Sequence, residues 1–350
     1  MAVQNPNNWH WVDKNCIEWA KKYFNDKLIG VSTSEDKDAT KYSKIDSISS
    51  FEGDCEVNQR KGKVISLFDL RTVLLISGHV EDEKFEGSIS IPEIAFDSEI
   101  DEYQFEISIY KETSKLTEIK PVIRESLLPK LREIFQTFGK DLLFANGNDI
   151  QVSEDKVTSN FTKSNQQTSF TDLAASSTVP SSGTSKPSNN TSAKKVASSI
   201  TGSSIKIGTG NLTSIHLEPT FNAPATDLYT TFLDKARIMA WSRSPIRCKG
   251  TEETIQLNEK FGLFGDNIES KLIEMVPNKL LVFEWRLNSW NTKITSTLKM
   301  EFHESKEYHE TKLQVTWSGI PVGEEDRARG NFEDYYVRSI KITFGFGAVL

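Results

Sequence analysis

Apolar and polar residues alternate along several segments of the chain, a pattern that predicts β-strands with one buried face and one solvated face. The alternation is most regular in residues 103–110 and 294–304. Apolar residues at helical spacing follow in residues 121–138 and again after Gly323. Each half of the chain therefore combines antiparallel strands with helices, which predicts the α+β class.

A polar stretch separates the two halves. From Ala174 to Thr213, 17 of 40 residues are Ser or Thr, so this stretch buries too little apolar area to offset the entropy of ordering it. We therefore expect an N-terminal α+β domain at residues 1–152, a flexible, disordered Ser/Thr-rich linker at 153–213, and a C-terminal domain at 214–350.

The N-terminal half is predicted to be an antiparallel sheet with flanking helices. Asp13 is a fitting N-cap for the first helix, and we expect the last helical region to be kinked or restarted at Pro129. Two helices cover only part of such a sheet, and the remaining sheet surface is then available to a partner.

The C-terminal half is predicted to be a curved antiparallel sheet that grips a long C-terminal helix. Acidic residues stand in the first turn of that helix and cations near its end, as the helix dipole favours. The space between sheet and helix is either a ligand cavity or a filled core. The residues alone select no ligand.

One stretch of the N-terminal half predicts a binding surface. Three cations, Arg60, Lys61 and Lys63, surround a glycine directly before a long apolar run. If alternate residues of this run face the core, Ile65 and Leu67 face outward beside the cations. Apolar side chains next to a cationic rim are typical of a protein-binding patch.

Two interpretations of this run remain open from its periodicity: an outward patch, or a strand buried on both faces. The charged residues Asp69 and Arg71 continue the outward row and favour the patch. Asp54 and Phe96 lie at predicted strand ends, where they either flank the patch or have a structural role. The core residues on the inward row would be Val64, Phe68, Leu70, Leu74 and Ile76.

The chain opens with a polar segment that carries two tryptophans. From the residues alone, we favour a structural role in which the two rings close an edge of the sheet. The alternative is a mobile arm that contacts a partner. The residues concerned are Asn5, Asn7, Asn8, Trp9, His10 and Trp11.

Composition excludes several classes of protein. The net charge is −7, whereas a general nucleic-acid binder is basic, so we expect no nucleic-acid partner. The three cysteines, Cys16, Cys55 and Cys248, lie far apart and form neither a disulfide framework nor a zinc spacing. No secretory signal and no run long enough to span a membrane is visible, so we expect a cytoplasmic protein with no membrane partner.

Catalytic motifs are missing from the sequence. Gly208 and Gly210 lie in the predicted linker, without the strand and helix that a phosphate-binding loop needs. His303 and His309 flank a predicted hairpin turn, but no further ligand is placed to complete a metal site. We expect no metal, no cofactor and no intrinsic enzyme activity.

Four motifs resemble those of a known family, the activators of heat shock protein 90 ATPase, which are cytosolic co-chaperones. The resemblance covers both folded halves and leaves the linker uncovered. The motifs are Asn5-x-Asn7-Asn8-Trp9-His10-Trp11, Arg60-Lys61-x-Lys63, Gly319-Ile320-Pro321-Val322-Gly323-Glu324-Glu325 and Phe344-Gly345-Phe346-Gly347.

This resemblance implies a two-armed activator of a heat shock protein 90 dimer. The N-terminal domain would dock on the middle segment of the chaperone, and a C-terminal helix-grip domain of the START-like type would engage its paired ATPase domains. Arg60, Lys61 and Lys63 would contact acidic groups, with Ile65 and Leu67 as apolar anchors. Asp54 and Phe96 would also contact the partner, and the opening arm from Asn5 to Trp11 would affect how the chaperone handles nucleotide.

Two other functions are kept as alternatives. The first is a small-molecule or lipid carrier that uses the START-like cavity of the C-terminal domain. The second is an enzyme that uses the region of His303 and His309. In the favoured interpretation the chain activates another protein's ATPase and is a monomer when free.

Overall fold

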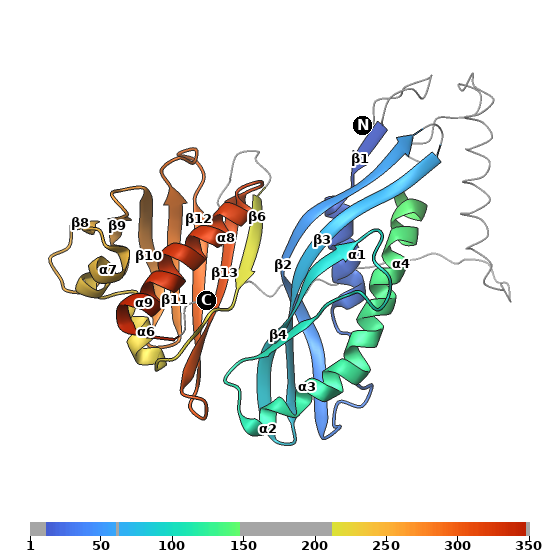
Figure 1. Ribbon diagram of the computed structural model, residues 1–350, viewed down its shortest axis with the longest axis horizontal. Helices are drawn as coiled ribbons and strands as arrows, with labels where there is room; N and C mark the ends of the chain where they lie inside the picture. Colours follow the sequence, from blue (N-terminus) through green and yellow to red (C-terminus); the bar gives the residue numbers. More distant parts are fainter. Residues whose placement is uncertain (1–11, 61–62, 148–211, 348–350) are drawn as a thin grey trace, which may run out of the picture.

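The computed structural model describes residues 12–60, 63–147 and 212–347 of the 350-residue chain. One antiparallel sheet is built from the N-terminal half and a second from the C-terminal half, each with its own helices (Figure 1). The expected α+β fold with two domains is confirmed. The predicted linker lies outside the described residues as far as Asn211.

The N-terminal sheet has five strands in the order β1-β2-β3-β4-β5. Its longest strands, β2 and β3, pair antiparallel along almost their whole length, from Lys41↔Val80 to Arg60↔Lys63. The bounds are Val12–Asn15 for β1, Lys41–Arg60 for β2, Lys63–Val80 for β3, Glu83–Ala95 for β4 and Glu106–Ile109 for β5.

Two helices, α1 (Ile17–Leu28) and α4 (Leu128–Asn146), cover one face of this sheet (Figure 1). Phe24 of α1 and Phe138 of α4 have ring centroids 4.6 Å apart, and Phe68 of β3 packs on Phe138 at 4.8 Å. This aromatic cluster joins the two helices to the sheet. The other face of the sheet, called the outward face below, carries no helix of the N-terminal domain among the described residues.

The helical region before α4 changes its hydrogen-bonding pattern. Helices α2 (Ser114–Thr117) and α3 (Ile119–Val122) are followed by the π-helix η1 (Ile123–Leu127). Helix α4 then begins with Pro129 in its first turn. Proline has no N–H to donate to the preceding turn, so the α-helix begins anew there. The predicted restart at Pro129 is confirmed.

The predicted helix N-cap at Asp13 is wrong. Asp13 belongs to strand β1, which pairs with β2 in the register from Val12↔Gln59 to Asn15↔Glu56. Helix α1 begins only at Ile17, whose N–H donates a hydrogen bond to Asn15 Oδ1 at 3.0 Å. Pairing with a distant strand, which local capping signals do not report, decides the conformation of these residues.

The C-terminal sheet follows the order β6-β13-β12-β11-β10-β9-β8, with β7 also paired to β13. All of its pairings are antiparallel. The bounds are Leu212–Leu217 for β6, Thr220–Phe221 for β7, Arg247–Cys248 for β8, Lys260–Leu263 for β9, Ile268–Val276 for β10, Leu280–Leu287 for β11, Ser296–Ser305 for β12 and Glu310–Pro321 for β13.

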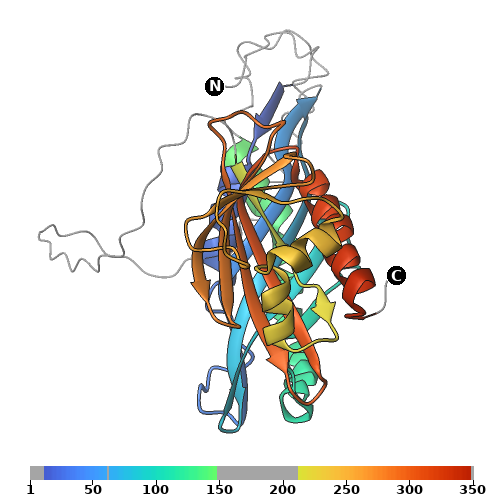
Figure 2. The ribbon, with the colours of Figure 1, turned by 90° about the vertical axis from the view of Figure 1, so that its left-hand side faces the viewer.

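A C-terminal helical segment lies across this sheet (Figure 2). Trp285 and Trp317 of the sheet have ring centroids 4.5 Å apart, and the Trp285 indole donates a hydrogen bond to the Tyr336 hydroxyl at 3.0 Å. The predicted helix-grip arrangement is confirmed. The helices are α6 (Ala225–Thr231), α7 (Lys235–Ser242), α8 (Glu325–Asn331), the π-helix η4 (Phe332–Arg338) and α9 (Ser339–Phe344).

The two domains contact one another. Strand β6, at the edge of the second sheet, runs beside β2 of the first, on the outward face (Figure 1). The outward face is therefore divided into a part covered by the C-terminal domain and a part near the β2–β3 hairpin tip.

Candidate partner-binding surface

The predicted patch lies on the outward face of the N-terminal sheet, near the tip of the β2–β3 hairpin. Ile65 and Leu67 of β3 are half-buried there. Alternate residues of β3 point to the helices, and all five predicted core residues are buried: Val64, Phe68, Leu70, Leu74 and Ile76. The strand is not sealed on both faces, so Ile65 and Leu67 stay partly accessible to a partner.

Acidic side chains border these two apolar residues. In the β2–β3 ladder, Glu56 lies opposite Leu67 and Asp54 lies opposite Asp69. Both Asp54 and Asp69 are exposed. Two like charges directly opposite one another repel, so this end of the patch favours a cationic group on the partner.

A glycine sets the close approach of the two strands at this point. Gly53 has a φ of +114°, and a side chain there would overlap the carbonyl oxygen of Asp69. The left-handed conformation is available to glycine at little cost. Gly53 therefore fixes where the neighbouring Asp54 side chain leaves the strand.

Phe96 stands close to the same part of the sheet. It follows the last residue of β4 and is 54% exposed. Its N–H donates a hydrogen bond to the carbonyl oxygen of Phe68 at 3.0 Å, which places Phe96 next to the segment of β3 that carries Leu67. The structure thus brings Asp54, Ile65, Leu67 and Phe96 to one end of the sheet.

The cations of the hairpin are described in part. Lys63 is exposed at the start of β3, and Arg60, the last residue of β2, lies opposite it in the ladder. Lys61 lies outside the described residues. The backbone positions of Arg60 and Lys63 lie at the hairpin tip, beyond Ile65.

The opening motif lies outside the described residues: Asn5, Asn7, Asn8, Trp9, His10 and Trp11. The described chain starts at Val12, whose backbone is opposite Gln59 of β2. The first described residue of the chain therefore lies beside the tip of the β2–β3 hairpin.

Sequence reasoning missed the acidic row on β2. Glu52, Asp54 and Glu56 stand two residues apart, and only Asp54 was singled out as a site residue. Their spacing of two was visible in the sequence and places them on one face of a strand. Glu52 is buried because the C-terminal domain covers it, which no local pattern could indicate.

In the described part of the chain, the candidate nucleophilic and metal-ligating side chains are either buried in contacts with neighbours or too far apart to hold a metal ion together. Burial raises the pKa of the Cys55 thiol to about 12, which keeps it protonated and unreactive. The buried His303 stacks on Tyr110, with ring centroids 4.5 Å apart, and shares a hydrogen bond with Gln314 at 3.0 Å. Residues 12–60, 63–147 and 212–347 contain no group of three or more metal-ligating side chains placed to hold an ion.

The space between sheet and helix in the C-terminal domain is a filled core. The cavity there has a volume of about 20 Å³ and is lined by aromatic and aliphatic residues that include Trp241, Trp285 and Tyr336. Ligand pockets in proteins have volumes on the order of 300–1,000 Å³. The cavity is far too small for a lipid or another small-molecule ligand.

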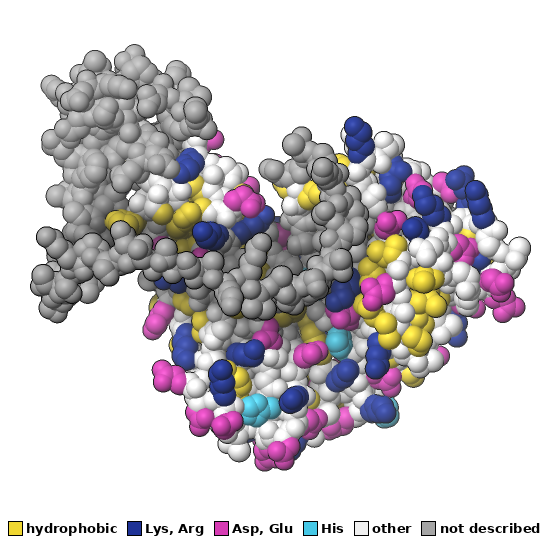
Figure 3. All heavy atoms as spheres, turned by 180° about the vertical axis from the view of Figure 1, so that it is seen from behind, with side chains coloured by type: hydrophobic (Ala, Val, Ile, Leu, Met, Phe, Trp, Pro, Cys, Tyr) yellow, Lys and Arg dark blue, Asp and Glu magenta, His cyan; other side chains and the backbone are white. Residues whose placement is uncertain are grey.

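Charged side chains of both signs are mixed on one face of the molecule, and most of the described helices are short. Lys, Arg, Asp and Glu side chains are interspersed over the face seen from behind in Figure 3. No helix in the described residues is long and apolar enough to cross a membrane.

The fold is that of a two-domain α+β protein whose first sheet carries partly exposed apolar side chains beside charged ones. Two family models match the chain: "Activator of Hsp90 ATPase, N-terminal" over residues 13–146, and "Activator of Hsp90 ATPase homolog 1-like protein" over residues 222–345. The chain is 59% identical to the Hsp90 co-chaperone AHA1 of Saccharomyces cerevisiae, and the alignment covers 100% of both proteins.

A more distant relative and a solved structure are also similar to this chain. The human activator of 90 kDa heat shock protein ATPase homolog 1 is 26% identical, with 99% of this chain and 94% of the relative covered. A crystal structure of an HSP90 activator from Plasmodium falciparum is 25% identical over 38% of this chain and 97% of that chain, with a TM-score of 0.35. This chain belongs to the family of Hsp90 ATPase activators.

Proposed function

We propose that this protein is a co-chaperone that binds an Hsp90 dimer and stimulates its ATPase by stabilising the closed, N-terminally paired state. An activator without catalytic groups speeds hydrolysis only if it binds the competent state of its partner better than the open state. A tenfold shift toward that state requires about 1.4 kcal/mol of differential binding. Family membership supports the partner and the activity.

In this proposal the N-terminal domain, residues 1–152, docks on the middle segment of Hsp90. Ile65, Leu67 and Phe96 supply the apolar contacts, and Arg60, Lys61 and Lys63 face acidic groups of the chaperone. Asp54 faces a cation. The observation that carries this part is the half-buried state of Ile65 and Leu67 on the outward face.

The C-terminal domain, residues 214–350, engages the paired ATPase domains of the chaperone. Two binding sites joined by one chain raise each other's effective concentration, so two weak contacts suffice. The segment 153–213 would be the tether, and the arm from Asn5 to Trp11 would act on nucleotide handling. The free protein would be monomeric and cytoplasmic.

ATP turnover by Hsp90 tests this proposal. Wild type is compared with a variant carrying Arg60→Ala, Lys61→Ala and Lys63→Ala, and with a control carrying Lys22→Ala, Lys37→Ala and Lys84→Ala. The control cations are exposed and lie elsewhere in the domain, and both variants lose the same charge. We expect wild type and control to stimulate fully, and the hairpin variant to need a higher concentration. Full stimulation by the hairpin variant contradicts the site, and no stimulation by wild type contradicts the function.

The salt dependence is a second expected result. The cations of the hairpin attract acidic groups of a partner electrostatically, and salt screens this attraction. The affinity of wild type should therefore fall more steeply with ionic strength than that of the hairpin variant.

A further inference from the structure

The contact between the two domains involves buried charges whose partners come from the other domain. Glu52 of β2 has a side chain that is only 4% exposed. Arg329 of α8 donates to its two carboxylate oxygens at 3.0 and 3.3 Å and also to the carbonyl oxygen of His216 at 3.0 Å. Burial raises the pKa of Glu52, and the charge of Arg329 opposes this. A buried carboxylate is stable as an ion only when it is paired.

A chain of polar groups crosses the interface beside this ion pair. Ser49 of β2 is hydrogen-bonded to His216 Nδ1 at 2.7 Å, and His216 Nε2 lies 2.8 Å from Glu218 Oε1. Tyr110 of the N-terminal domain donates its hydroxyl to the same Glu218 oxygen at 2.5 Å. His303 covers the ring of Tyr110. Two of these hydrogen bonds, Ser49–His216 and Tyr110–Glu218, join the two domains, so polar groups at the contact are satisfied across it as they are in a protein interior.

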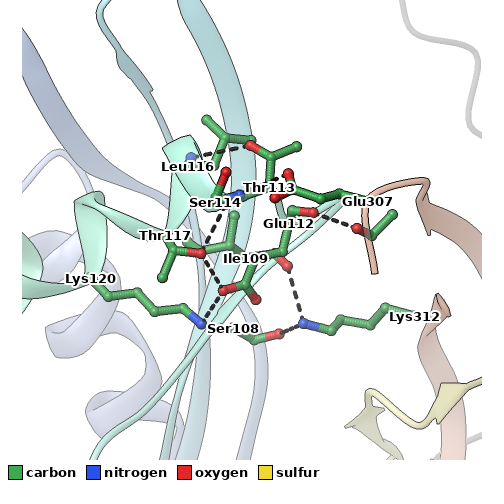
Figure 4. Close-up of polar contacts among 11 residues, drawn as sticks. Ser108, Ile109, Glu112, Thr113, Ser114, Leu116, Thr117, Lys120, Glu307 and Lys312 are labelled. Atoms are coloured by element: carbon green, nitrogen blue, oxygen red, sulfur yellow. Dashed lines mark hydrogen bonds and ion pairs between the residues drawn. The ribbon is translucent and has the colours of Figure 1, made fainter. Parts of the chain in front are cut away.

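A third set of contacts lies where β5 and helix α2 meet the β12–β13 hairpin (Figure 4). Lys312 of β13 donates to Ser108 Oγ at 2.8 Å and to the carbonyl oxygen of Ile109 at 3.1 Å. The N–H of Ser114 donates to a carboxylate oxygen of Glu307 at 2.9 Å. Burial lowers the pKa of Lys312, because it disfavours the charged form. The two oxygens of the N-terminal domain accept hydrogen bonds from this ammonium group and offset part of that cost.

The interface ends where the partner-binding patch begins. Arg71 of β3 lies 3.4 Å from Asp326 of α8, and the next outward residue toward the hairpin tip is Asp69, which is exposed. Asp54 and Phe96 are exposed as well. The patch is thus open to a partner while the C-terminal domain stays in place.

We propose that in the free chain the C-terminal domain is held on the outward face of the N-terminal sheet by this interface, and that Hsp90 must displace it for full activation. The requirement that Hsp90 displace this domain rests on the proposed function. Both domains belong to one chain, so the contact acts at an effective concentration on the order of millimolar and a modest affinity keeps it closed. When only a fraction of the molecules is in the binding-competent state, the apparent Kd equals the intrinsic Kd divided by that fraction.

Distance measurement by double electron–electron resonance tests the docked state. Spin labels are placed at Lys22→Cys and Lys293→Cys, both exposed positions, with Cys248→Ser to remove the most accessible native thiol. We expect one narrow distance distribution for the free labelled protein. Adding Arg329→Glu repels Glu52 and should give a broad distribution at longer distance.

The matched control is Arg327→Glu. Arg327 lies on the same helix and pairs with Glu324 of its own domain at 3.2 Å, so its distribution should stay narrow. Near-ultraviolet circular dichroism of the tryptophans reports whether each variant is folded. If Arg329→Glu does not fold, Lys312→Met takes its place at the other end of the interface. A broad distribution for the parent protein, or a narrow one for the folded interface variant, overturns the docked state.

ATPase stimulation separates docking from its proposed role. The patch is accessible in both forms, but full stimulation requires the open form. If the closed form makes up about 90% of the free chain, opening it should therefore lower the half-saturating concentration for stimulation by up to about tenfold. An equal or higher half-saturating concentration for Arg329→Glu contradicts the restraint. Absence of stimulation by wild type contradicts both the proposed function and the restraint. In that case the distance distributions still test whether the C-terminal domain is docked in the free chain.

Discussion

Replacing Ile65 and Leu67 together with alanine should weaken binding to Hsp90 about 15-fold. Each substitution removes three carbon atoms, and burying one such group contributes about 0.8 kcal/mol. Because both side chains are already mostly buried in the free protein, about a third of this remains to be gained on binding, or roughly 0.8 kcal/mol per residue. Two residues give about 1.6 kcal/mol, which corresponds to a change in Kd of about 15-fold.

Isothermal titration calorimetry of the full chain with Hsp90 measures this change in Kd. The control is Ile29→Ala, because Ile29 is 45% exposed and follows helix α1, on the opposite side of the sheet. Denaturant unfolding shows whether the double variant is folded, and its free energy of unfolding should fall by only about 2 kcal/mol. A loss of affinity below about threefold, or an equal loss in the Ile29→Ala control, would refute the assignment of the patch.

Three further predictions concern stability. Gly53→Ala should lower the free energy of unfolding by about 1–3 kcal/mol, because an alanine side chain at this φ of +114° meets Asp69; an unchanged denaturant midpoint would contradict this. Trp285→Ala should cost about 3–5 kcal/mol in the C-terminal domain, since the ring fills its core, and calorimetry should show a lower Tm. Burial raises the pKa of Glu218, but the hydrogen bond and charge of His216 outweigh it, and the pKa falls from 4.5 to about 2. The stability that Glu218 contributes is thus present above pH 4.5 and lost as pH falls toward 2, and unfolding of Glu218→Gln should depend less on pH in that window.

The orientation of the side chains of strand β3 could be predicted, because it follows from the order of apolar and polar residues within the strand itself. Alternation from Val64 to Ile76 sets which residues face the helices, and the charges at Asp69 and Arg71 identify the other face. The structure agrees at each of these positions. The helix restart at Pro129 is local in the same sense, since it follows from a missing N–H.

Features that depend on distant partners could not be predicted. Asp13 looks like an N-cap, yet it pairs with Asn58. Glu52 looks like a solvated strand residue, yet it lies under Arg329, which is 277 positions away. Likewise, whether the second domain has a cavity or a filled core depends on how side chains such as Trp285 pack. The alternation of apolar and polar residues does not give this packing.

Photo-crosslinking from position 67 tests the central claim most directly. The photoreactive residue p-benzoylphenylalanine is placed at Leu67 in one variant and at Ile29 in the other, and each is irradiated with Hsp90 and a non-hydrolysable nucleotide. The account predicts crosslinks from position 67 to the middle segment of Hsp90 and none from position 29. Equal crosslinking from both positions, or none from position 67, would contradict it.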